Sequence, residues 1–194
     1  MRHLRPTIVL TFLLLAITGL IYPGVITALG QLLFPHRANG SLVRVNGQVV
    51  GSELIGQAFT QPYYFHSLPS AAGAGYDPTA SAGSNKGPTD RKLADTLIAG
   101  SVAEARAQTG ATGTLPADMV TRSASGLDPH ISPANAELQV ARVARARGTT
   151  PEAIHALVQR HTEGRTLGFL GEPRINVLLL NLALDSQFPR NPNR

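Results

Sequence analysis

Cysteine and tryptophan are absent from this 194-residue chain, and its aromatic residues are only four Tyr and six Phe. Without cysteine the chain has no disulfide, no thiolate nucleophile, no thiolate metal site and no lipid-anchoring cysteine. With so few aromatic side chains, the core must rest mainly on Leu, Val, Ile and Ala.

An excess of charge of either sign is also missing. The chain has 17 Lys and Arg against 12 Asp and Glu, and without Arg2 and Arg5 near the N-terminus the excess is only three. A nucleic-acid-binding protein typically carries a basic stripe with stacking aromatics. The basic cluster of Arg142, Arg145 and Arg147 has no aromatic beside it. We therefore expect no nucleic-acid partner.

Charged side chains are absent from one long segment, which runs from Thr7 to Pro35. A helix needs about 20 mostly apolar residues to cross the hydrocarbon core of a bilayer. The 28 residues from Thr7 to Phe34 would make a helix about 42 Å long. We predict a short N-terminal segment (residues 1–6), one transmembrane helix (7–34) and a single soluble domain (35–194), which is long enough for one compact core.

A cleaved signal peptide is the alternative to an anchor, because basic residues precede the apolar run and Ala28-Leu29-Gly30 offers small residues at a cleavage site. A signal core is typically about 7–15 residues long. This run is about twice that length, so we favour an uncleaved anchor that also contacts lipid.

The flanking charges do not fix the orientation of the anchor. Arg2 and Arg5 on one side face Arg37 and Arg44 on the other. Positive charge marks the cytoplasmic side, but large domains translocate largely regardless of charge. The terminal amine tips this balance slightly toward a cytoplasmic N-terminus.

Small residues recur along the anchor at spacings of three and four, which places them on one helical face. They are Ala16, Gly19, Pro23, Thr27 and Gly30. Small residues let a second helix approach closely in lipid, and a neighbour can cover the carbonyl that Pro23 leaves free. Gly and Pro are common in membrane helices in any case. We nevertheless predict a partner-helix docking face, and expect Gly19→Leu or Gly30→Leu to weaken assembly.

The remainder predicts an α+β domain. Asn46-Gly47 between residues 42–45 and 48–50 is typical of a β-hairpin, and residues 61–65 are expected to form another strand. Helices are predicted over residues 90–108, 133–147, 151–163 and 173–185, from capping residues, prolines and following glycines. The last helix should bury Ile175, Leu178, Leu179 and Leu182.

The densest polar stretch runs from Ser123 to Pro133. It is not a Gly-x-Ser-x-Gly nucleophile elbow, and a triad needs hydrogen-bonded geometry that adjacency does not supply. A turn begun by Asp128-Pro129 is the simplest explanation, with a binding loop or a hydrolase site of Ser125, Asp128 and His130 as alternatives. We assign no catalytic residue and no metal ligand, since the histidines lack metal-ligand spacing.

Segments along almost the whole chain, in order, resemble one family. They are Leu4-Arg-Pro6, Thr18–Pro23, Phe34–Leu42, Gly51–Gln57, Tyr64–His66, Gly83–Asn85, Ser123–Pro133, His161–Arg165 and Gly171–Asp185. The chain thereby resembles the C-subunit family (KdpC) of the bacterial Kdp potassium-transporting ATPase.

The resemblance implies a place in an inner-membrane complex, with the soluble domain outside the cytoplasm. The implied partners are a channel-like subunit that selects potassium, a P-type ATPase subunit and a small single-span subunit. The family is described as a catalytic chaperone that raises the ATP affinity of the ATPase subunit. ATP binding is attached to it, and Ser125, Gly126, Asp128 and His130 are the nucleotide contacts we would expect here. We expect no other cofactor.

These implications conflict, because ATP and the P-type catalytic domains lie in the cytoplasm. A domain outside the membrane cannot reach the nucleotide in the assembled pump. We therefore expect an indirect effect, through the small-residue face of the anchor, and the domain could also cap the potassium entrance. A membrane-anchored hydrolase and a solute-binding module are the competing functions, and co-purification with pump subunits separates them.

Overall fold

The structure is a computed structural model that describes residues 2–189. The chain forms two compact units, of which the first ends at Val50 and the second begins at Gly51. Together they contain both helices and short antiparallel strands, which confirms the predicted mixture of α and β structure.

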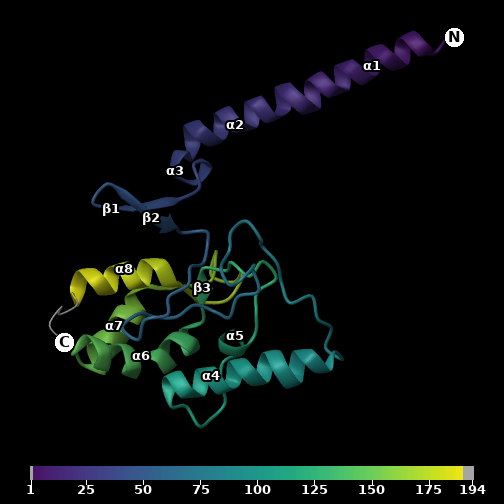
Figure 1. Cartoon of the computed structure of the whole chain (residues 1–194). Helices are drawn as coiled ribbons and strands as arrows, with labels where there is room; N and C mark the ends of the chain where they lie inside the picture. The colour runs from purple at the N-terminus through teal and green to yellow at the C-terminus, as the bar shows by residue number, and fades with distance from the viewer. Residues whose placement is uncertain (1, 190–194) are drawn as a thin grey trace. The chain divides into compact units, whose positions relative to one another are not determined.

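An apolar helix dominates the first unit (Figure 1). It comprises α1 (Leu4–Ala16), a π-helical segment (Ile17–Ile21) and α2 (Tyr22–Leu33). The whole stretch Leu4–Leu33 is long and apolar enough to cross a membrane. The helix therefore starts three residues before the predicted span and ends one residue earlier.

The π-helical segment lies directly before Pro23. The backbone N–H of Tyr22 donates to the carbonyl of Ile17, five residues back, instead of four. Proline has no N–H to continue the α-helical ladder, and a single π-turn is a common way to absorb such an interruption. The Thr18 hydroxyl also donates to the carbonyl of Leu14 at 2.7 Å.

A hairpin follows the short helix α3 (Pro35–Ala38). Its strands are β1 (Leu42–Val45) and β2 (Gln48–Ser52). Asn46 and Gly47 both have positive φ, at 51° and 79°, as a type I′ turn requires. The hairpin predicted from Asn-Gly is confirmed.

The second unit contains five α-helices in its described part. They are α4 (Ala99–Thr109), preceded by a π-helical segment (Leu93–Ile98), α5 (Ala117–Val120), α6 (Pro133–Arg147), α7 (Pro151–Arg160) and α8 (Val177–Gln187). The Ser132 and Thr150 side chains cap α6 and α7, and Gly110 and Gly148 end α4 and α6 in the left-handed conformation. The predicted bounds of the helices over residues 90–108, 133–147 and 151–163 are confirmed to within a few residues.

A small sheet joins three short strands in the order β3 (His130–Ile131), β5 (Arg174–Asn176) and β4 (Thr162–Glu163), all antiparallel. The predicted start of the last helix at residue 173 is therefore wrong. β5 pairs on both sides, and the side chain of Asn176 caps α8 by accepting from the N–H of Leu179. The expected burial of Ile175 and Leu178 is confirmed, whereas Leu179 and Leu182 are only half-buried. Leu180 and Leu184 are the other buried leucines of α8.

The core of this unit lies among α6, α7, α8 and the sheet (Figure 1). Its largest fully buried apolar side chains are aliphatic apart from Phe65, as the composition predicts. They include Phe65, Ile131, Ile154, Leu157, Ile175, Leu180 and Leu184.

Residues 61–65 do not form the predicted strand; residues 61–64 form a turn, in which the N–H of Tyr64 donates to the carbonyl of Gln61 at 3.0 Å. Side chains of the helices bind their backbone instead: Asn181 accepts from the N–H of Phe65 at 2.8 Å and donates to its carbonyl at 2.9 Å. Arg147 donates to the carbonyl of Tyr63, and its guanidinium lies about 5 Å from the centres of the Tyr63 and Tyr64 rings. This irregular segment thus has partners for the backbone groups of Phe65 and the carbonyl of Tyr63 without a neighbouring strand.

Candidate functional site

Residues 125–127 form a turn whose three consecutive carbonyls are bound by three different segments. The N–H of Ala82 donates to the carbonyl of Ser125 at 3.0 Å, and the N–H of Gly56 donates to that of Leu127 at 2.8 Å. The Ser70 hydroxyl donates to the carbonyl of Gly126 at 2.6 Å. The turn therefore fastens three loops that carry little regular structure of their own.

Gly126 makes this convergence possible. Its φ is +68°, and an added Cβ would lie 2.6 Å from both the amide nitrogen of Ala72 and the carbonyl oxygen of Ala82. These are backbone atoms, which cannot rotate away as the end of a side chain can. The position requires a glycine for both conformation and space.

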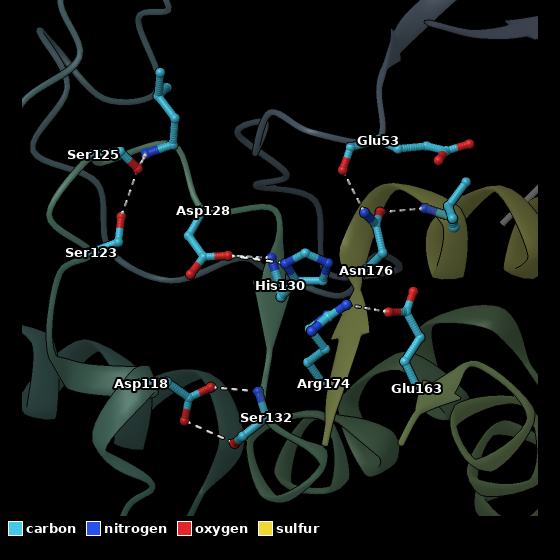
Figure 2. A network of polar contacts seen from close by, with 12 residues as sticks. Glu53, Asp118, Ser123, Ser125, Asp128, His130, Ser132, Glu163, Arg174 and Asn176 are labelled. Carbon is cyan, nitrogen blue, oxygen red and sulfur yellow. Dashed lines mark hydrogen bonds and ion pairs between the residues drawn. The ribbon is translucent and has the colours of Figure 1, made fainter. Parts of the chain in front are cut away.

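The polar side chains of the predicted nucleotide site are engaged within the same turn (Figure 2). The Ser125 hydroxyl accepts from the N–H of Leu127 at 3.1 Å and lies 3.4 Å from the Ser123 hydroxyl. Asp128 Oδ1 accepts from the N–H of His130 at 2.9 Å and lies 3.2 Å from His130 Nδ1.

Electrostatics favour an ionised Asp128. The hydrogen bond from His130 holds the pKa of Asp128 below its ordinary value, against the opposing effect of partial burial, and the charge of Arg174 adds to the lowering. A carboxylate in this place repels an anionic phosphate unless a cation comes between them.

The structure brings Ser125, Gly126, Asp128 and His130 together in one turn, but it does not join them as a catalytic relay. Asp128 contacts His130, whereas the hydroxyl of Ser125 is bound to Leu127. A nucleophilic serine needs a base within hydrogen-bonding reach. The described contacts of this turn are those of a structural junction.

The far end of the Ser123–Pro133 stretch is equally engaged (Figure 2). Asp118 accepts from the N–H and the hydroxyl of Ser132, at 2.7 and 2.9 Å, while the same hydroxyl caps α6. Asn176 donates to the carbonyl of Glu53 at 2.8 Å. The predicted cap at Ser132 is confirmed, with Asp118 as an additional partner.

A cavity of about 250 Å³ lies elsewhere, between α4, α6 and residues 58–69. None of the four predicted nucleotide contacts lines it. Its polar lining includes Ser67, Ser101, Glu104 and Asn135.

His66 connects α4 to residue 61 beside this cavity through two hydrogen-bonding contacts. Its Nδ1 lies 2.9 Å from Gln108 Oε1 and its Nε2 lies 3.0 Å from the carbonyl of Gln61. Gln108 in turn donates to Glu104 at 3.0 Å. Burial, with the charge of Arg142, lowers the pKa of His66 in spite of these acceptors.

The predicted docking face on the apolar helix is open within the described chain. An added Cβ at Gly19 or Gly30 would meet no atom within 4 Å. Pro23, Thr27 and Gly30 lie together on α2, at helical spacing. The π-turn rotates Ala16 relative to them, because each residue in a π-helix advances by a smaller angle than in an α-helix.

Comparison with known proteins gives one family. The family model described as "K+-transporting ATPase, c chain" (KdpC) matches residues 4–186. The chain belongs to the KdpC family. This membership confirms the resemblance on which the sequence interpretation rested.

Relatives of the KdpC family match over nearly their whole length. A potassium-transporting ATPase KdpC subunit of Gemmatimonas aurantiaca is 60% identical, covering 100% of this chain and 97% of that protein. The same subunit of Koribacter versatilis is 52% identical (97% and 96%), and that of Myxococcus xanthus is 57% identical (92% and 85%).

The cavity of this KdpC-family chain was not predicted from its sequence. Its His66 and Glu104 lie 38 positions apart in the sequence, and α4 meets the 58–69 segment only in the folded domain. The polar residues at every third or fourth position of α4, Ser101, Glu104 and Gln108, were the available signal for a polar face turned toward another element.

Proposed function

We propose that the chain is an accessory, non-catalytic subunit of an ATP-driven potassium uptake pump. The observation that carries this proposal is the match to the KdpC family over residues 4–186, in a chain whose described part has one helix long and apolar enough to cross a membrane. The relatives are named subunits of a potassium-transporting ATPase, which makes the proposed partners the other subunits of such a pump.

The proposed topology places residues 1–6 in the cytoplasm, residues 7–34 across the inner membrane and residues 35–194 outside the cytoplasm. The absence of cysteine makes a direct test simple. We expect a membrane-impermeant maleimide to label Gly87→Cys in intact spheroplasts, and to label His3→Cys only after lysis. Labelling of His3→Cys alone in intact spheroplasts would reverse the topology.

In this topology the chain acts on ATP affinity indirectly. The open small-residue face of the anchor docks on the channel-like, P-type or single-span subunit and favours the nucleotide-binding state of the ATPase subunit, which holds the ATP. A bound subunit shifts such an equilibrium only through different contacts in the two states. The acting surface therefore belongs to the anchor or to the domain surface that touches the pump.

The test is co-expression with the other pump subunits, followed by purification in detergent. We expect the chain to co-purify at a fixed ratio, and potassium-stimulated ATP hydrolysis at limiting ATP to fall when it is omitted. A chain that purifies alone, with the pump fully active without it, would refute the accessory role.

Direct nucleotide contact through Ser125, Gly126, Asp128 and His130 is the second candidate, favoured only by their meeting in one turn. ATP titration of the full chain in detergent tests it by calorimetry. Micromolar binding that is lost in Asp128→Asn and His130→Gln would establish direct contact. Absence of binding leaves the contacts of the anchor and of the domain surface with the pump as the acting part.

A further inference from the structure

An apolar tip projects from the second unit between β4 and β5. Its side chains, Leu167, Phe169 and Leu170, are 78%, 68% and 48% exposed. Single exposed apolar residues are normal, but three within four positions make a patch that calls for an explanation. We call these three residues the apolar tip.

The backbone of the apolar tip is closed and partly strained. Thr166 and Leu170 exchange two backbone hydrogen bonds of 2.9 Å, and the N–H of Gly168 donates to the carbonyl of Arg165 at 3.0 Å. Leu167 has a φ of +55°, a left-handed conformation that is unfavourable for a leucine. The fold thus holds a leucine in an unfavourable conformation and exposes it to water, and neither feature stabilises the free domain.

Balanced ion pairs surround the tip. Arg165 pairs with Glu172 at 2.7 Å, and Arg174 pairs with Glu163 at 3.0 Å. Segments that bind an anionic membrane surface carry an excess of Lys and Arg, whereas here each arginine is matched by a carboxylate. An apolar centre with a polar rim of both signs is the arrangement found in protein–protein interfaces.

We propose that the apolar tip is a docking contact for another protein subunit of the pump, seated in an apolar depression whose rim carries no net charge. The proposal rests on the proposed function as an accessory subunit. Aromatic and large aliphatic side chains that fill a pocket dominate the affinity of such contacts.

The test uses the full chain, co-expressed with the other pump subunits and purified in detergent. The variant Leu167→Asn/Phe169→Ser removes the two most exposed of the three apolar side chains, and asparagine tolerates the left-handed conformation of position 167. We expect the retained complex to fall at least tenfold, while the unfolding midpoint of the variant chain stays equal or rises. The matched control is Leu54→Asn, which changes a leucine of the same unit that is 60% exposed.

Each outcome decides one part of the proposal. Failure of the unaltered chain to co-purify would overturn the accessory function itself. Retention of the variant in detergent, where no bilayer is present, or equal loss in Leu54→Asn, would overturn only the role of the apolar tip.

A second measurement does not depend on the variant's stability. With the photoreactive benzoylphenylalanine in place of Phe169, irradiation of membranes should link the chain to a pump subunit identified by mass spectrometry. Links to lipid alone, or to a second copy of this chain, would contradict the proposal.

Discussion

At Gly126, a left-handed backbone and the close approach of two other segments coincide. The amide nitrogen of Ala72 and the carbonyl of Ala82 occupy the space that a side chain would need. Gly110 has almost the same φ, +71°, but an added Cβ there meets no atom within 4 Å. Substitutions at Gly126 and Gly110 therefore separate the free-energy cost of the left-handed conformation from the cost of steric overlap.

Gly126→Ala should lower the free energy of unfolding by about 3 kcal/mol or more, since two backbone segments must move. Gly110→Ala should cost only about 1 kcal/mol, from its conformation alone. Urea unfolding of the full chain in detergent, followed by circular dichroism, measures both. Equal losses would mean that the junction at residues 125–127 is looser than described.

The buried imidazole of His66 predicts a pH dependence. Its pKa in the folded domain is lowered below 6.5, mainly by burial and next by Arg142, so the unfolded chain binds this proton more readily. Stability should therefore fall as the pH drops below about 6.5, until the pH passes the pKa of the folded state.

His66→Gln should flatten this decline in the unfolding midpoint between pH 7 and 5. His161, whose pKa is lowered by burial and Arg160, contributes in the same direction, so His161→Gln should remove another part. Thermal unfolding at a series of pH values measures the effect. An unchanged decline in both variants would exclude these histidines as its source.

At the scale of elements, the irregular 61–66 segment depends on side chains of α6 and α8. Asn181 is 1% exposed and pairs with both backbone groups of Phe65. Gln139 accepts from the N–H of His66 at 2.8 Å and donates to its carbonyl at 3.1 Å. Two buried amides thus take the place of a missing neighbouring strand.

Asn181→Leu should cost about 3 kcal/mol, because it leaves the buried N–H and carbonyl of Phe65 without partners. Exchange of the Phe65 amide hydrogen should accelerate with it. Gln159→Leu, at an exposed amide on α7, is the control and should change stability by less than about 0.5 kcal/mol. Slow exchange at Phe65 in Asn181→Leu would show that other contacts hold this segment.

The elements that could be predicted from the sequence are those whose signals lie in adjacent residues. Asn46-Gly47, Ser132-Pro133 and Thr150-Pro151 each fix a turn or a helix start through local chemistry, and the structure confirms them. Strands of two or three residues, such as β5, follow from pairing partners far along the chain. No local pattern distinguishes Arg174–Asn176 from the first turn of a helix.

The candidate site was predictable to the same extent. Asp128-Pro129 indicates a turn, and a turn is present. The partners that engage its carbonyls come from Gly56, Ser70 and Ala82, which lie more than 40 positions away. Their role depends on tertiary packing, as does the cavity around His66.

At the scale of the whole molecule, this KdpC-family chain combines an apolar helix long enough to cross a membrane with a compact second unit. The polar groups of the 125–130 turn are engaged in structural contacts, whereas the small-residue face of the anchor and the apolar tip are open. We therefore propose that this subunit acts through its contacts with partners.

The most direct test is the equilibrium dissociation constant of a non-hydrolysable ATP analogue for the assembled, purified pump. Gly30→Leu, which adds bulk to the docking face, should raise this constant about fivefold or more, the lower range of allosteric coupling. Leu32→Phe, on the opposite surface, and Asp128→Asn should leave it unchanged. A constant raised by Asp128→Asn and unaffected by Gly30→Leu would contradict the account.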